Sequence, residues 1–167
     1  MPEELKSGDF TTAKAKIVIV DPDEKTGAFI SSLLGEDLFE IHLAKSGEEA
    51  KQAVSEHEPD LIIIEKELPD RAGLDLLNEL LQLWPSFTPI MITPYPSHEF
   101  VVQSINKGVV CYLTKPFEDP AKVKAKVDLA LSRHRLEVGW HKRLAEMQKA
   151  NDKMKKHLER IENGKAK

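Results

Sequence analysis

The sequence of 167 residues is poor in cysteine and has no long apolar segment. Its single cysteine, Cys111, excludes an intrachain disulfide and a zinc cage built from several cysteines. No apolar run approaches the roughly 18 residues that a membrane-spanning helix needs. The first 16 residues resemble neither a signal peptide nor an Arg-rich transit peptide. We therefore expect a cytoplasmic protein without a membrane segment.

The common motifs of nucleotide-binding and hydrolytic enzymes are also absent. The chain contains no glycine-rich phosphate loop, no Gly-x-Ser-x-Gly and no His-Glu-x-x-His. The spacing of His42, His57 and His98 is not that of metal ligands. These absences predict a protein that is not an enzyme and has no resident cofactor.

Positive charge is scarce in most of the chain and concentrated at its end. Residues 1–132 carry 13 Lys and Arg against 23 Asp and Glu, a net charge of −10, whereas residues 133–167 carry 11 against 5, a net charge of +6. This break predicts a globular part followed by a physically different appendage. The basic end permits nucleic-acid binding on charge alone. However, five acids interrupt it and aromatic residues do not alternate with its basic ones, so the sequence argues against that function.

Strand and helix patterns alternate five times along the globular part. Strands are expected at residues 16–20, 39–44, 61–64, 89–93 and 109–114, because these runs are apolar and rich in β-branched residues. Helical spacing follows each of them, with capping signals at Ser46 and Glu49 and again at Asp119 and Pro120. Such alternation predicts an α/β fold in which helices cover both faces of a doubly wound parallel sheet.

The third strand leads into the most informative segment, residues 59–73. Three isoleucines precede Glu65, and the chain then continues Lys66-Glu67-Leu68-Pro69 and reaches Gly73. An acid at the carboxyl end of a buried parallel strand lies where ligands bind in open α/β sheets. The pattern acid-x-x-Leu-Pro-x-x-x-Gly resembles the phosphoacceptor segment of CheY-like receiver domains of two-component signalling. The resemblance covers roughly residues 16–133 and implies a flavodoxin-like sheet with strand order 2-1-3-4-5.

This resemblance implies a role for several further residues. Asp21 and Asp23 would supply the acidic pocket, and Glu65 would stand at the phosphoacceptor position. Thr93 corresponds to the switch hydroxyl, Tyr112 to the aromatic residue that changes rotamer, and Lys115 to the site lysine. Lys115-Pro116 would be a cis peptide bond, which is costly for residues other than proline.

Two departures from the family pattern predict a site that is not phosphorylated. Glu65 stands where the family has aspartate, and its extra methylene misplaces the carboxylate by about 1 Å, which can cost on the order of 100-fold in rate. Pro22 stands where the family has its second acid, so a metal would have only Asp21 and Glu65 as ligands, and we expect weak Mg²⁺ binding or none. Glu65 would pair with Lys115. That pair either fixes the domain in one state, active or inactive, or belongs to a docking module that does not respond to phosphorylation.

The basic end carries a heptad pattern beyond Gly139, the one weak point of a long helix. Glu137 is its first a position, and Asn151 at a central a position favours a parallel two-stranded coiled coil. The predicted dimer seam comprises Trp140, Leu144, Met147, Asn151, Met154, Leu158 and Ile161. The alternative is a solvated helix without a partner.

These observations predict an N-terminal arm at residues 1–15, a receiver domain at 16–133, a helical extension at 134–163 and a disordered end at 164–167. We expect a signalling module that acts through protein contacts. Its partners would be a second copy, through the C-terminal helix and the face of the fourth helix, fifth strand and last helix, and an unidentified kinase or output domain. The alternative is a regulatory fragment of a larger response regulator or kinase.

Overall fold

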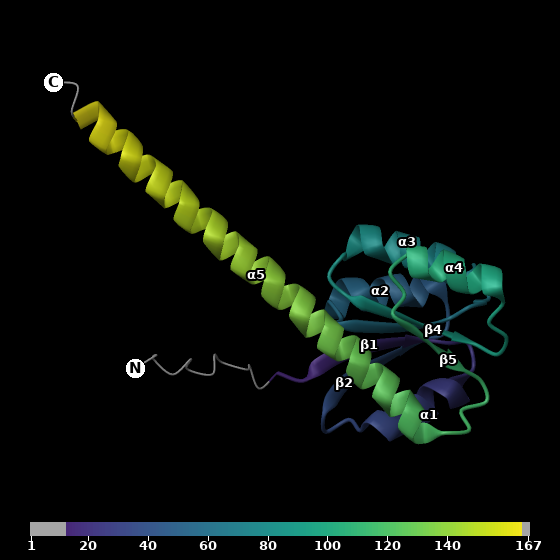
Figure 1. The fold of residues 1–167 in the computed structure, drawn as a ribbon. Helices are drawn as coiled ribbons and strands as arrows, with labels where there is room; N and C mark the ends of the chain where they lie inside the picture. The colour runs from purple at the N-terminus through teal and green to yellow at the C-terminus, as the bar shows by residue number, and fades with distance from the viewer. Residues whose placement is uncertain (1–12, 165–167) are drawn as a thin grey trace.

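The computed structural model describes residues 13–164, which form a five-stranded parallel sheet covered by helices on both faces (Figure 1). The strand order is β2-β1-β3-β4-β5, as predicted. The elements in chain order are β1 (Ala15–Val20), α1 (Glu24–Leu34), β2 (Phe39–Ala44), α2 (Gly47–His57), β3 (Leu61–Glu65), α3 (Gly73–Leu83), β4 (Thr88–Thr93), α4 (His98–Asn106), β5 (Cys111–Thr114) and α5 (Pro120–Gly164).

The sheet divides the core into two apolar layers. On one face, strand residues such as Val18 and Ile62 pack against α2, α3 and α4. On the other face, alternate residues such as Ile19 and Ile63 pack against α1 and the first part of α5. Every residue of β3 is buried, because both faces of this central strand are covered. The continuous run of isoleucines is therefore the signature of a strand with no exposed face.

Local sequence signals account for most element boundaries, with two differences. The capping box at α2 is displaced by one residue: Ser46 Oγ accepts from the N–H of Glu49, but the Glu49 carboxylate accepts from the N–H of Lys45 rather than of Ser46. The last strand is shorter than predicted. Val109 and Val110 lie outside β5 because the N–H of Val109 bonds to the carbonyl of Ser104 at the end of α4.

The last helix is continuous from Pro120 to Gly164 and extends far beyond the domain as a rod (Figure 1). Its buried residues, among them Val127 and Leu131, all precede position 135. The predicted arm and end are mostly outside the described residues: Ala15 already belongs to β1, and Gly164 is the last residue of α5. Among residues 13–164, no helix has the length and apolar character required to cross a bilayer.

Candidate functional site

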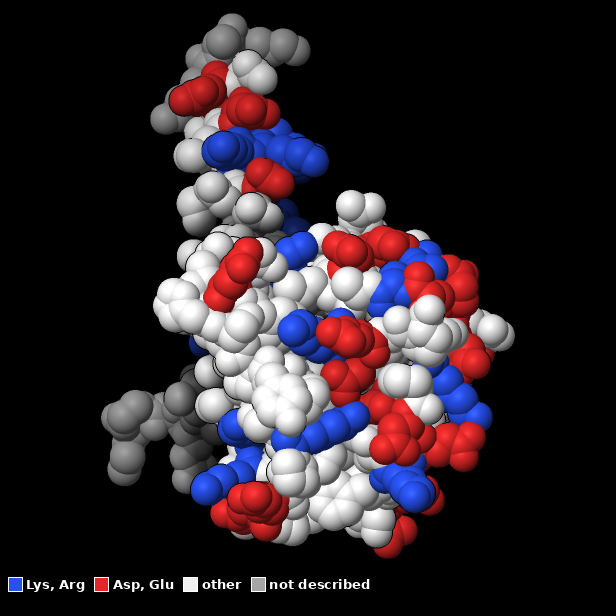
Figure 2. Space-filling model, turned by 90° about the vertical axis from the view of Figure 1, so that its right-hand side faces the viewer, with Lys and Arg blue, Asp and Glu red and all other residues white. Residues whose placement is uncertain are grey.

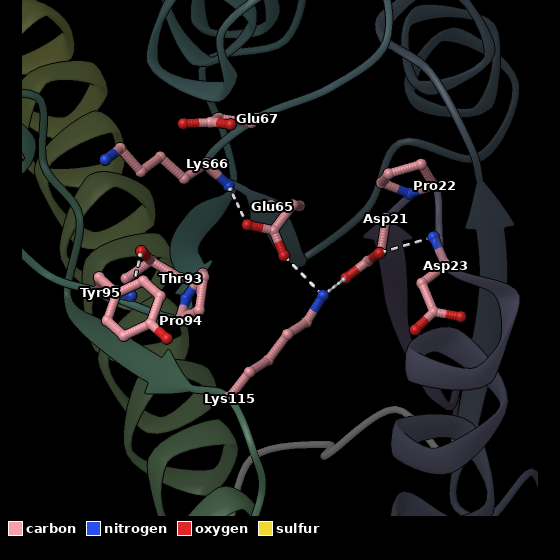
Figure 3. Close-up of a pocket in the computed structure, with 10 residues that line it drawn as sticks. All are labelled: Asp21, Pro22, Asp23, Glu65, Lys66, Glu67, Thr93, Pro94, Tyr95 and Lys115. Atoms are coloured by element: carbon pink, nitrogen blue, oxygen red, sulfur yellow. Dashed lines mark hydrogen bonds and ion pairs between the residues drawn. The ribbon is translucent and has the colours of Figure 1, made fainter.

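A pocket of about 390 Å³ opens at the carboxyl ends of β1, β3, β4 and β5 (Figure 3). This is the edge at which ligands bind in open parallel sheets. The topology brings together side chains that are far apart in the sequence, up to 94 residues in the case of Asp21 and Lys115. The pocket is lined by Asp21, Pro22, Asp23, Glu65, Lys66, Glu67, Thr93, Pro94, Tyr95 and Lys115.

The centre of the pocket is a lysine that bridges two carboxylates. The Lys115 ammonium lies 2.7 Å from Asp21 Oδ2 and 2.7 Å from Glu65 Oε2 (Figure 3). Both acids are almost fully buried, whereas a quarter of the Lys115 side chain is exposed. The second oxygen of each acid is also occupied: Asp21 Oδ1 accepts from the N–H of Asp23, and Glu65 Oε1 accepts from the N–H of Lys66. The two acids thus form one bonded group with Lys115.

Burial and charge act in opposite directions on this group. Burial raises the pKa of Glu65 above its ordinary value, with a contribution from the nearby Asp21 carboxylate, although Lys115 opposes the shift. Burial also lowers the pKa of Lys115, but its bonds to Asp21 and Glu65 outweigh that effect and the net shift is upward. The lysine is therefore held protonated, and it is the cation that allows two carboxylates to be buried side by side.

The turn after β3 explains why the sequence has glycine at position 73. The N–H of Gly73 donates to the carbonyl of Lys66 at 2.7 Å, and this bond closes the loop that follows Glu65. A Cβ atom at Gly73 would lie 2.2 Å from the backbone carbonyl oxygen of Glu65. The glycine thus permits a close approach of the backbone to the carboxyl end of β3.

The three residues after β1 have separate functions. Asp21 is 4% exposed and enters the pocket. Pro22 has no side-chain oxygen to offer. Asp23 is the N-cap of α1, where its carboxylate accepts from the N–H of Lys25 at 3.0 Å. Asp23 therefore lines the pocket without joining the Lys115 group.

The remaining predicted residues lie on β4, β5 and the loops that follow them. Thr93 is fully buried, and its hydroxyl accepts from the N–H of Tyr95 at 3.2 Å rather than contacting Glu65 (Figure 3). The Tyr112 hydroxyl donates to the carbonyl of Val101 in α4 at 3.0 Å. The Lys115-Pro116 peptide bond is cis, as the resemblance implied.

Two features of the site were not predicted from the sequence. The bond between Lys115 and Asp21 joins the carboxyl end of β5 to that of β1, and the spacing of the two residues in the sequence does not predict it. Lys66, which follows Glu65, places its ammonium 5.0 Å from the centre of the Phe100 ring, a cation–π contact on the rim of the pocket.

A model of the response regulator receiver domain matches residues 17–128, more than half of the chain. The chain belongs to this family. Receiver domains are modules of two-component response regulators, and the match includes most of β1, the other four strands and the residues of the pocket.

Curated relatives include both stand-alone receiver domains and larger regulators. The alkaline phosphatase synthesis transcriptional regulatory protein PhoP of Bacillus subtilis is 30% identical over 118 residues, which are 71% of this chain and 49% of that protein. The chemotaxis protein CheY of Halobacterium salinarum is 26% identical over 114 residues, which are 68% of this chain and 95% of that protein. The chain matches only 24% of the length of the response regulator protein PilR of Pseudomonas aeruginosa.

Solved receiver domains have the same fold. The signal receiver domain of an HD domain-containing protein from Pseudomonas fluorescens superposes with a TM-score of 0.72 at 28% identity, covering 80% of this chain and 98% of that one. A CheY-like receiver domain protein from Methanospirillum hungatei gives 0.69 at 28% identity, covering 75% and 99%.

Proposed function

We propose that this receiver domain transmits signals through protein contacts without forming an aspartyl phosphate. The observation that carries this proposal is the Lys115 ammonium, which contacts both Asp21 and Glu65 at 2.7 Å. Glu65 stands at the phosphoacceptor position, and its carboxylate has no unbonded oxygen in this arrangement. A phosphoryl donor would have to displace Lys115 and then react with a carboxylate one methylene longer than the usual acceptor.

The pocket does not fit the divalent metal that receiver domains use. Mg²⁺ requires nearly octahedral coordination by oxygen atoms, commonly with one or two carboxylates and several waters. Here Pro22 supplies no ligand, Asp23 caps α1, and the carboxylates of Asp21 and Glu65 are both bonded to an ammonium group. The Glu67 side chain also lines the pocket but lies apart from these two acids (Figure 3). Lys115 neutralises charge in the pocket without any bound ion, so we expect Mg²⁺ to have little effect on the domain.

The consequence of a permanent Glu65–Lys115 pair is a domain fixed in one conformation. The bond between Tyr112 and Val101 ties β5 to α4, and the Thr93 hydroxyl is occupied by the loop that precedes α4. The hydroxyls of Tyr112 and Thr93 therefore have hydrogen-bond partners in the absence of a phosphoryl group. This state presents one constant surface to a kinase or an output domain, and regulation would come from the presence of that partner.

Phosphorylation by a small-molecule donor tests the proposal directly. The full chain is incubated with acetyl phosphate and Mg²⁺, and the intact mass is measured. We expect no phosphoryl adduct on the native chain or on Glu65→Asp, because Pro22 still removes a metal ligand. The double variant Pro22→Asp/Glu65→Asp should gain an adduct and so serves as the positive control. A stoichiometric adduct on the native chain would overturn the proposal, and one on Glu65→Asp alone would overturn the role given to Pro22.

The exposed part of α5 supports a homodimer as the form in which the module acts. Its seam residues are strongly exposed for apolar side chains: Trp140 is 67% exposed, Met147 is 68% and Met154 is 63%. They recur with the spacing of a heptad along one side of a continuous helix. A second copy of the helix would cover this stripe, and Asn151 in its middle would select a parallel pair in register.

A substitution pair in the full chain tests the dimer. Leu144→Glu/Leu158→Glu places two charges in the seam, whereas Lys149→Glu changes the charge of a position outside it. We expect the sedimentation mass to fall from dimer to monomer for the seam variant and to remain dimeric for the control. A native chain that sediments as a monomer at micromolar concentration would overturn this part of the proposal.

A second candidate is that the receiver regulates an output domain in a longer protein. It is favoured by the curated relatives, because the chain spans only about a quarter to three fifths of several of them. Nucleic-acid binding is less well supported. Figure 2, which looks onto the end of the domain where α5 begins, has acidic and basic side chains interspersed and no continuous basic surface.

A further inference from the structure

Two histidines that the sequence separates by 15 positions are stacked at one edge of the domain. The His42 ring on the edge strand β2 and the His57 ring at the end of α2 have centroids 3.5 Å apart and planes 6° apart. Glu40 lies two positions before His42, so it projects from the same face of β2. Its Oε1 is 2.9 Å from His42 Nε2.

These side chains offer a set of nitrogen and oxygen ligands. One ligand atom each from Glu40, His42 and His57 can be chosen so that all lie within 4.8 Å of one another. A second carboxylate is near, because Glu56 Oε2 lies 3.8 Å from His57 Nε2. About a quarter of the His42 side chain and somewhat more of His57 are exposed. Solvent can therefore reach the cluster, and its groups have room to rotate.

We propose that Glu40, His42 and His57 form a binding site for a divalent transition-metal ion of the zinc type. Two imidazoles and a carboxylate suit zinc, copper or nickel, whereas Mg²⁺ and Ca²⁺ prefer sites built from oxygen alone. Zinc with three protein ligands retains a fourth position for water. This proposal is independent of the pocket around Lys115, which lies at the opposite ends of the strands.

The geometry requires a modest adjustment on binding. Zinc–nitrogen bonds are about 2.0–2.1 Å, so two ligands of one tetrahedral zinc lie about 3.3 Å apart. The parallel rings must rotate so that their lone pairs converge, and His42 must exchange its contact with Glu40 for a shared ion. A neighbouring cation, the Lys16 ammonium, donates to the backbone carbonyl of His57 at 3.0 Å.

Metal binding at this place would join an edge strand to a helix. Within residues 13–164, β2 pairs only with β1, and its other edge has no partner strand there. A zinc ion held by β2 and the last residue of α2 would restrain that edge against fraying, because it binds the folded chain in preference to the unfolded one. At a zinc concentration of about 100 times Kd, we expect Tm to rise by about 5 °C or more.

The test is a calorimetric titration of the full chain with Zn²⁺, followed by the same titration with Mg²⁺. We expect one zinc per chain and no saturable heat from Mg²⁺. His42→Gln and His57→Gln should each weaken zinc binding at least tenfold, and Glu40→Gln by less. The matched control is His98→Gln, which removes an imidazole at the start of α4, away from the cluster, and should leave the affinity unchanged.

Histidine-ring ¹⁵N spectra and the sedimentation mass identify where zinc binds. Shifts confined to the rings of His42 and His57, with no change in mass, support the site. Shifts of His141 or His157 instead, one zinc per two chains, or equal loss of affinity in His98→Gln would each overturn it. No saturable zinc binding up to millimolar concentration would overturn it as well.

Discussion

Removal of the Lys115 charge should destabilise the domain in a way that depends on pH. Lys115→Met keeps most of the side-chain volume but leaves Asp21 and Glu65, which are 4% and 7% exposed, without a cation between them. Breaking a fully buried ion pair by removing one partner costs about 3–5 kcal/mol. Because a quarter of the Lys115 side chain reaches solvent, we expect a smaller loss of about 2–3 kcal/mol in the free energy of unfolding at pH 7.

The sign of the pH dependence follows from Glu65. Its pKa is already raised by burial, and it will rise further when the ammonium is absent. A raised carboxyl pKa contributes stability that is present when the group is protonated and is lost as pH rises through the folded-state pKa. The penalty of Lys115→Met should therefore be smaller at pH 5 than at pH 7, and Glu65→Gln/Lys115→Met should recover part of it at pH 7.

Urea denaturation measures these differences, with Lys45→Met as the matched control. Lys45 pairs with Glu24, but 57% and 73% of the two side chains are exposed, so its replacement should have little effect on the free energy of unfolding. If Lys115→Met costs the same as Lys45→Met, or if its cost does not change between pH 5 and pH 7, the bridge does not stabilise the pocket as we argue.

Two further predictions concern the residues that position the site and the last helix. Gly73→Ala should lower the free energy of unfolding by about 2–3 kcal/mol, because the added Cβ would meet the Glu65 carbonyl, whereas Gly139→Ala, where the space is open, should not lower it; equal costs in urea denaturation would contradict this. Asp60 accepts from the N–H of Lys16 at 2.8 Å and lies 3.2 Å from His134 of α5. Burial raises the pKa of Asp60, but the bonds to His134 and Lys16 outweigh burial, and the net shift of the pKa from 3.8 is downward. This carboxylate therefore stabilises the fold above pH 3.8, and the stabilisation is lost as pH falls through the folded-state pKa. Asp60→Asn should cost about 1 kcal/mol at pH 7, since Asp60 is partly exposed, and progressively less toward pH 3; a cost independent of pH would contradict the assignment.

The fold could be predicted from the sequence because each strand has a local sequence signal. The isoleucines of β3 and the β-branched run of β1 are continuous apolar segments, which is the pattern of strands in a sheet covered on both faces. The end of β4 was also predicted correctly, at Thr93. The start of β5 was not, because the bond between Val109 and Ser104 is a tertiary detail that strand propensity does not contain.

Only those contacts of the site that follow from a sequence motif could be predicted. The pairing of Glu65 with Lys115 was expected and is present at 2.7 Å. The second bond of Lys115, to Asp21, joins residues 94 positions apart and depends on the register of three strand pairs, β1–β3, β3–β4 and β4–β5. The stacking of His42 on His57 was missed for the same reason, since the spacing of the two residues carries no signal until β2 and α2 are folded against each other.

The continuity of α5 turns the domain into the short arm of a lever. The helix is anchored in the core up to His134, and about 30 residues project beyond it, which is about 45 Å at 1.5 Å per residue. A tilt of about 10° at the anchored end would then move the far end by about 8 Å. A small shift of the anchored part of α5 would therefore produce a much larger displacement at the far end of the helix, where a protein attached to it or bound there would be moved.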